Sequence, residues 1–336
     1  MKLKPFLYNM LPFVGLVFVI VVSMIAIQIK DPSGEDLANF MSFDNIRTVL
    51  IQTVVVGIAA LGMTLVIISA GIDLSVGSQI ALATVVFAFV VNGGSVTPPE
   101  VDSASGLAVT LAILATIGAC GLCGLFNGWI SSKFRIVPFI VTLGTMLIFR
   151  GVAKWIAGGE AVRTPKNAAQ GFMDYDGALG IGIGFYLLIA SIIVTAVLLK
   201  RTVLGRYIYA IGSSENTARL CGIGVENQKV FIYVLCGVFT GLAGVMQYSF
   251  LGSGNPTIAV GLELNIIAAV VIGGGSLNGG SGSAMGTFIG ALIMSILGST
   301  CTMLGAETYV QEMTIGSIVI IAVGIDRLKH LKRFQS

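Results

Sequence analysis

Long apolar segments recur along this chain and are separated only by short clusters of charge, glycine and proline. Several of them approach or exceed the ~20 residues that an α-helix needs to cross the ~30 Å hydrocarbon core of a bilayer. Only 10% of the 336 residues are charged, whereas soluble domains carry roughly 25%. Because so little charge cannot cover a protein of this size in water, the pattern predicts an all-α polytopic membrane protein.

Charges and Gly/Pro clusters divide the sequence into about ten expected transmembrane helices, which form a single transmembrane domain of residues 1–336. The first follows the positive start MKLKPF, but its 22 residues exceed the ~7–15 of a signal-peptide core. Several others are shorter than ~20 residues, so we expect their ends to pack between other helices. The expected spans are residues 8–29, 48–70, 78–92, 107–131, 137–150, 181–199, 230–251, 257–272, 284–304 and 310–325.

The distribution of Lys and Arg predicts that the N and C termini both lie in the cytoplasm. With ten spans and an inner N terminus, thirteen of the 19 Lys and Arg residues fall in inner segments. These include the N terminus (1–7), the connection 200–229 and the basic tail 326–336. The other six, Arg150 among them, fall in outer segments. A net charge of +3 gives no reason to expect nucleic acid as a partner.

The longest inner connection is the largest surface that this topology offers to a cytoplasmic partner. Within it, Ser213 or Ser214 can cap a short helix, and Glu215 lies in its first turn, where the helix dipole favours negative charge. Gly222 and Gly224 then provide stops. A short capped helix is therefore expected on the inner face. The residues alone leave a docking helix and an ordinary surface loop equally open.

Motifs for enzymatic chemistry are missing from the sequence. It contains no phosphate-binding G-x-x-x-x-G-K-[ST] pattern and no H-E-x-x-H,. The lone histidine, His330, lies in the basic tail, and the pair Cys120 and Cys123 lies inside an apolar run with no further ligand nearby. We therefore expect no catalytic residue, no bound cofactor and no metal site, and small packing roles for the two cysteines.

Two charges and two glycine-rich breaks interrupt the expected spans. Charge inside a membrane is costly and is usually functional, so Asp73 is a pathway candidate or a cap of the helix continuing through Ser75. Glu263 is a candidate for the pathway or for helix packing. The breaks 69–78 and 272–283 are expected at the inner side, buried in protein or lining a wet cavity. The pathway candidates are Thr64, Ser69, Asp73, Asn127, Thr142, Thr145, Glu263 and Asn265, of which about half the Ser and Thr hydroxyls are expected to bond to their own helix.

Five segments together resemble the permease subunits of ribose-, xylose- and galactose-type ATP-binding-cassette (ABC) importers. The resemblance covers roughly residues 40–328, in order and without large gaps. The segments are GMTLVIISAGIDLSVGS (62–78), VPFIVTLGTMLIFRG (137–151), LGRYIYAIGSSENTARLCGI (204–223), LELNIIAAVVIGGGSLNGGSGSAMGTFIGALI (262–293) and the closing basic tail.

The resemblance implies a monosaccharide permease of the bacterial cytoplasmic (inner) membrane, with ten helices in the lipid bilayer and both termini inside. It implies a second permease copy, as a homodimer or close heterodimer, an extracytoplasmic sugar-binding protein, and a separate cytoplasmic ABC ATPase that carries ATP and Mg. The chain would have no ATPase site of its own. The residues that correspond to the coupling helix, which docks on the ATPase, are Ser213, Ser214, Glu215, Asn216, Thr217, Ala218, Arg219, Leu220, Gly222 and Ile223.

Three positions depart from the pattern common in this family. Asn265 replaces an acidic residue, and Asn216 and Cys221 replace more usual residues of the coupling segment. Two other classes of protein fit the composition. A ten-helix secondary transporter, or a metabolite exporter of the drug/metabolite type, would work without an ATPase, and Asp73 and Glu263 would then be its coupling groups. A passive membrane scaffold would not need broken, glycine-rich spans.

Overall fold

The computed structural model describes residues 3–173, 182–307, 309–318, 320–321 and 324, and it is almost entirely helical. Residues 309–318 are also helical. The elements are α1 (Leu3–Lys30), α2 (Glu35–Phe40), α3 (Phe43–Ile68), α4 (Val76–Val91), α5 (Gly106–Lys133), α6 (Pro138–Ala157), β1 (Val162–Arg163), the 3-10 helix η1 (Ala168–Gly171), α7 (Ile183–Arg201), α8 (Val203–Ser213), α9 (Glu215–Leu220), α10 (Val225–Leu251), β2 (Ser253–Gly254), α11 (Leu262–Ile272) and α12 (Ala284–Met303).

Seven helices in the described part of the chain are long and apolar enough to cross a membrane, which confirms the all-α membrane class. Two further apolar helices are shorter: α4 has 16 residues and α11 has 11. At 1.5 Å per residue they are ~24 Å and ~17 Å long, so neither crosses ~30 Å alone. The expected span 257–272 therefore begins too early, because α11 starts only at Leu262. The tenth expected span, 310–325, lies partly outside the described residues.

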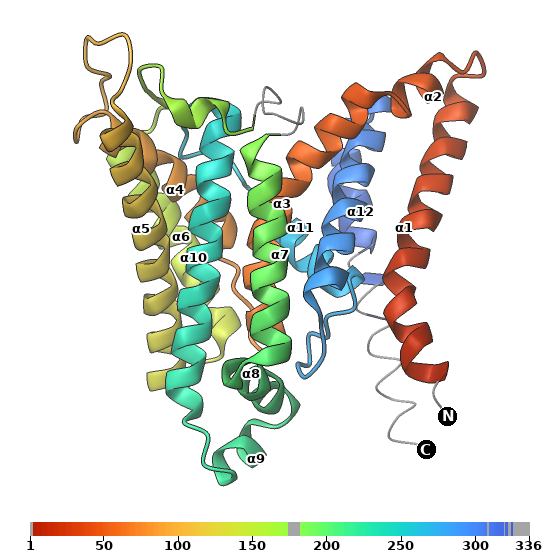
Figure 1. Ribbon diagram of the computed structural model, residues 1–336, viewed down its shortest axis with the longest axis vertical. Coiled ribbons are helices and arrows are strands. Elements are labelled where there is room, and N and C mark those ends of the chain that lie inside the picture. Colours follow the sequence, from red (N-terminus) through yellow and green to blue (C-terminus); the bar gives the residue numbers. More distant parts are fainter. Residues whose placement is uncertain (1–2, 174–181, 308, 319, 322–323, 325–336) are drawn as a thin grey trace.

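The helices form an upright bundle whose two ends carry different elements (Figure 1). Helices α8 and α9 lie at one end, called here the α9 end, and α1 begins at the same end. Helix α2 lies at the opposite end. The antiparallel strands β1 and β2 follow the helix termini Ala157 and Leu251.

Helix α3 is the centre of the bundle. It packs against α7, α10, α11 and α12. In its most apolar stretch of 18 residues, 83% of the residues are buried. A helix that is apolar on all sides is stable only when protein or lipid surrounds it completely. Helix α1 is the opposite case, because it packs mainly on α12 and only 17% of the residues in its most apolar 18-residue stretch are buried. Most of its surface is therefore left for lipid.

Glycines let helices α5 and α10 approach each other backbone to backbone. A Cβ placed on Gly124 of α5 would lie 2.1 Å from the carbonyl oxygen of Tyr233 in α10. A Cβ on Gly237 of α10 would lie 2.2 Å from the carbonyl oxygen of Cys120 in α5. Such contacts between small residues hold membrane helices together where the hydrophobic effect is weak. The other expected packing residue, Cys123, is buried as a free thiol like Cys120.

The expected boundary at residue 150 is wrong. Helix α6 continues past Arg150 to Ala157, so this arginine lies inside a membrane-spanning helix and not in an outer loop. Apolar residues such as Val152 and Ile156 continue the helix beyond the charge. The arginine is tolerated there because its guanidinium meets backbone carbonyls, as described next.

Candidate functional site

Four polar side chains meet at the break between α3 and α4. Asp73 and Asn127 are completely buried. The Asp73 carboxylate accepts hydrogen bonds from the Ser75 amide (2.9 Å) and the Ser75 hydroxyl (2.6 Å). The Asn127 side-chain amide donates to both carboxylate oxygens at 3.3 Å, and that of Gln79 donates to one of them at 3.4 Å. Asp73 and Asn127, both predicted from the sequence, therefore belong to one cluster.

The role of Asp73 differs in one respect from the expected helix cap. Ser75 occupies the N-cap position of α4, and Asp73 instead bonds the backbone amide two residues further on, which is an Asx turn,. Every hydrogen bond that described residues donate to this carboxylate comes from a neutral group. The side-chain oxygens of Gln79 and Asn127 are buried without a partner, and such groups carry a desolvation cost.

Neighbouring helices hold the backbone of this break in place. The carbonyl oxygen of Ile72 accepts hydrogen bonds from the Tyr233 hydroxyl of α10 (3.2 Å) and the Thr142 hydroxyl of α6 (3.3 Å). Ala70 has a φ of 60°, an unusual conformation for a residue with a side chain,. Thr142, predicted as a pathway residue, thus contacts the break directly.

Three other predicted hydroxyls lie outside this cluster. Ser69 and Thr145 bond to backbone carbonyls of their own helices, those of Val66 and Thr142. Thr64 bonds to the Ala60 carbonyl and also lies 2.6 Å from the Thr287 hydroxyl, which joins α3 to α12. Thr142 also donates to the Phe139 carbonyl of its own helix at 3.3 Å. All four predicted hydroxyls, rather than about half of them, therefore bond to their own helices.

Glu263 lies in a second polar region, at the start of α11. One carboxylate oxygen accepts from the Gly261 amide at 3.3 Å, and the other is buried without a hydrogen-bond partner. The buried oxygen lies against α4, where a Cβ on Gly77 would be 2.2 Å from it. Asn265, the departure from the family pattern, is half-buried in the same helix.

Arg150 of α6 completes this second region, and sequence reasoning missed it. Its guanidinium donates to the carbonyls of Pro256 (3.1 Å) and Ile258, with Ala259 at 3.5 Å. These carbonyls belong to the irregular segment that leads into α11. The predicted helix ended at residue 150 because of the charge of Arg150. The apolar residues on both sides of this arginine could instead have marked it as a candidate, because an arginine within an apolar span normally has a local partner.

The expected capped helix on the inner connection is present as α9. The Ser214 side chain accepts from the Thr217 amide at 3.3 Å, so Ser214 and not Ser213 is the N-cap. Gly222, with a φ of 81°, follows the helix end, and its amide donates to the Arg219 carbonyl at 3.0 Å.

Ion pairs within α9, and between α9 and the start of α10, stabilise α9. Arg219 pairs with Glu215 (2.7 Å) and with Glu226 at the start of α10, and Lys229 also pairs with Glu215. Burial alone would raise the pKa of Glu215, but the hydrogen bonds from Lys229 and Arg219 outweigh it and the pKa is lowered.

One face of α9 is packed and the other is free. Ala218 is buried in a small cluster with Ile211 and Val225. Leu220 is 88% exposed, and the two departures Asn216 and Cys221 are exposed as well. The exposed face of α9 thus combines an apolar side chain with charged groups whose geometry is fixed by ion pairs.

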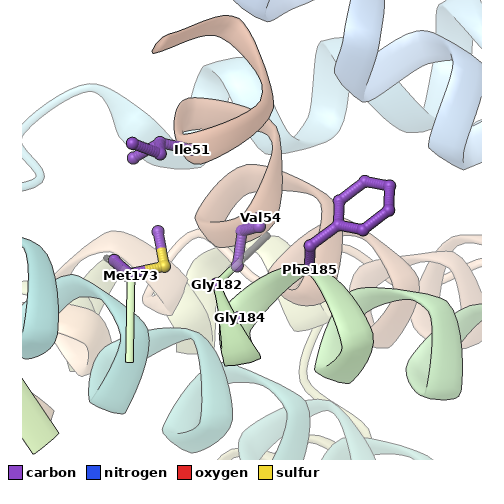
Figure 2. Close-up of a pocket in the computed structure, with 6 residues that line it drawn as sticks. All are labelled: Ile51, Val54, Met173, Gly182, Gly184 and Phe185. Atoms are coloured by element: carbon purple, nitrogen blue, oxygen red, sulfur yellow. The ribbon is translucent and has the colours of Figure 1, made fainter. Parts of the chain in front are cut away.

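A small recess between α3 and the start of α7 does not belong to either polar region. Figure 2 shows its lining, which is apolar or glycine throughout. The lining residues are Ile51, Val54, Met173, Gly182, Gly184 and Phe185. A recess without hydrogen-bonding side chains does not suit a polar solute.

Comparison with known proteins places the sequence of this chain in a family. A family described as branched-chain amino acid transport system / permease component matches residues 45–323. The chain is 40% identical over 295 residues to the ribose import permease protein RbsC of Escherichia coli K12, covering 87% of this chain and 88% of that protein. It is 36% identical over 320 residues to RbsC of Bacillus subtilis 168, covering 95% and 92%.

A third relative has a different sugar in its name. The galactose/methyl galactoside import permease protein MglC of E. coli K12 is 34% identical over 331 residues, with 95% of each chain covered. No solved structure matches the chain.

Proposed function

The chain belongs to the family of branched-chain amino acid transport system permease components, and we propose that it is the transmembrane permease subunit of an ABC importer for a monosaccharide. The observation that carries this proposal is its similarity, over 87–95% of its length, to permeases whose names specify ribose or galactose import. A ribose-like solute is favoured because both ribose permeases are more similar than the galactose permease.

The proposed partners are a second permease copy, a cytoplasmic ABC ATPase that holds ATP and Mg, and an extracytoplasmic sugar-binding protein. The α9 end would face the cytoplasm of a bacterium, since it carries the residues that correspond to the coupling helix. The exposed Leu220 and the paired Glu215 and Arg219 support a docking surface there. A helix held by a cap and by ion pairs keeps its shape when a partner pushes on it.

The solute would pass by alternating access, which requires two conformations that bind partners differently. Two polar regions are available for the pathway: Asp73 with Asn127, and Glu263 with Arg150. The unpartnered carboxylate oxygen of Glu263 is an acceptor that the hydroxyls of a neutral sugar could use once α11 moves away from α4. The energy for this movement would come from the ATPase, because the chain has no nucleotide-binding motif.

Co-purification from native membrane in mild detergent tests the proposal. We expect the wild-type chain to retain a stoichiometric ATPase, and a Glu215→Ala/Arg219→Ala double variant to lose most of it. The matched control is Lys154→Ala/Glu160→Ala, because both side chains are exposed and far along the chain from α9. Absence of any ATPase from the wild-type preparation would point to a transporter that works without one.

A further inference from the structure

Three chain segments converge on one another beside α9, and they do so through backbone atoms. They are the end of α3 at Ile68, the end of α8 at Gly212, and the break between α11 and α12 at Gly280. The Gly280 amide donates to the Ile68 carbonyl at 2.8 Å. A Cβ on Gly212 would lie 1.7 Å from that same carbonyl oxygen and 2.6 Å from the Gly280 nitrogen. No side chain therefore separates the three segments here.

The break is shaped to receive the end of α8. Gly279 and Gly280 have φ values of 86° and 75°, a left-handed conformation that favours glycine,. A Cβ on Gly279 would lie 2.6 Å from the Gly212 carbonyl oxygen. A side-chain hydrogen bond adds to this fit, because the Tyr209 hydroxyl donates to the Gly282 carbonyl at 2.8 Å.

Helices α8 and α9 are joined tightly enough to move together. Only Ser214 separates them, and it caps α9. Ile211 of α8 and Ala218 of α9 pack together with Val225 at the start of α10. A displacement of α9 is therefore passed to Gly212 rather than absorbed in a flexible linker.

We propose that Gly212 and Tyr209 are positioning residues that transmit movement of α9 to both broken regions of the bundle at once. Through Ile68 the movement reaches the break that carries Asp73 and leads into α4. Through Gly280 and Gly282 it reaches the break between α11 and α12. Packed contacts of this kind switch between discrete arrangements rather than deform continuously. One movement of α9 therefore shifts the α3–α4 break and the α11–α12 break together. This inference rests on the proposed coupling of α9 to an ATPase.

The test uses the full importer, reconstituted in lipid vesicles with its ATPase and binding protein, and measures ribose uptake and ATP hydrolysis together. We expect Gly212→Ala to retain the ATPase while the ribose moved per ATP falls by about 10-fold or more, because the added methyl group separates the three segments. The matched control is Gly224→Ala, where a Cβ has no atom within 4 Å and φ is −72°.

A second pair of variants covers the case in which Gly212→Ala does not fold. Tyr209→Phe removes only the hydroxyl that bonds the Gly282 carbonyl, and Tyr207→Phe is the same change two residues earlier in α8. We expect uptake per ATP to fall by about 2- to 10-fold for Tyr209→Phe, the range that corresponds to one lost hydrogen bond, and to stay unchanged for Tyr207→Phe. Normal coupling in Tyr209→Phe, or in a folded Gly212→Ala, would overturn the inference. If no ATPase binds even the wild-type chain, the proposed function itself fails.

Discussion

Replacement of Arg150 by methionine tests whether the segment before α11 depends on a charge inside the membrane. Methionine replaces the first four atoms of the arginine side chain with an unbranched apolar chain of similar length, but it lacks the guanidinium and cannot donate hydrogen bonds. The guanidinium donates to the carbonyls of Pro256 and Ile258, with a longer contact to Ala259. In Arg150→Met these carbonyls lose their donor inside a membrane-spanning segment, where water can replace it only in part.

The size of the effect follows from the two shorter hydrogen bonds. A hydrogen bond from a charged group contributes about 1.5–3 kcal/mol. Because Arg150 is half-buried, part of this is recovered by water, and we expect a loss of about 2–4 kcal/mol in the free energy of unfolding. Arg150→Lys should fall between the wild type and Arg150→Met, since an ammonium keeps the charge but lacks the planar fork.

The assay is equilibrium unfolding in mixed micelles, followed by circular dichroism, for both Arg150 variants. Lys154→Met serves as the control, because Lys154 is exposed one turn further along α6. The control should change the free energy of unfolding by no more than about 0.5 kcal/mol. If Arg150→Met is as stable as Lys154→Met, the guanidinium does not hold the segment and the reasoning is wrong.

Three further changes address other contacts. Thr64→Val and Thr287→Val should each lower the free energy of unfolding by about 1 kcal/mol. The double variant should lose less than the sum of the two, because one hydrogen bond joins the two hydroxyls,. Thermal unfolding of the three variants tests this, and strictly additive losses would contradict it. Ser214→Ala should speed amide exchange across α9 by roughly 2- to 30-fold through loss of the N-cap,, and exchange no faster than wild type would contradict it. Because its ion pairs lower the pKa of Glu215, they stabilise α9 fully above the unfolded pKa of about 4.5, and this effect is lost as pH falls through the folded pKa,. The protection factor of the α9 amides, which is the intrinsic exchange rate at each pH divided by the observed rate, should therefore fall in acid and stay constant between pH 6 and 8; a protection factor that does not fall in acid would contradict this.

Local signals in the sequence were sufficient to predict the seven long apolar helices that the structure describes, and α9. A span is an apolar run long enough to cross the membrane. Helix α9 is indicated by a capping serine followed by Glu215 and by the glycines after its end. These signals depend on residues within one or two turns of each other, so they can be read without knowledge of the fold. The predicted helix end at residue 150 and the predicted helix start at residue 257 were wrong, because the contacts made there involve residues that are distant in the sequence.

The remaining features depend on partners that are distant in the sequence. Arg150 is accepted inside α6 because carbonyls more than a hundred residues later receive its hydrogen bonds. Asp73 and Asn127 are 54 residues apart, and only the packing of α5 against the α3–α4 break brings them together. A glycine-rich break could be recognised from composition, but its contact with Gly212 could not, because that contact is made by the backbone.

Uptake of labelled ribose into vesicles that contain the chain, its ATPase and its binding protein tests the importer function most directly. We expect ribose to accumulate against its gradient only when all three proteins and ATP with Mg are present, and a vesicle with the chain alone to remain inactive under a proton or sodium gradient. Gradient-driven uptake by the chain alone, without ATP, would contradict the importer function and make Asp73 and Glu263 the groups to study as ion-coupling residues.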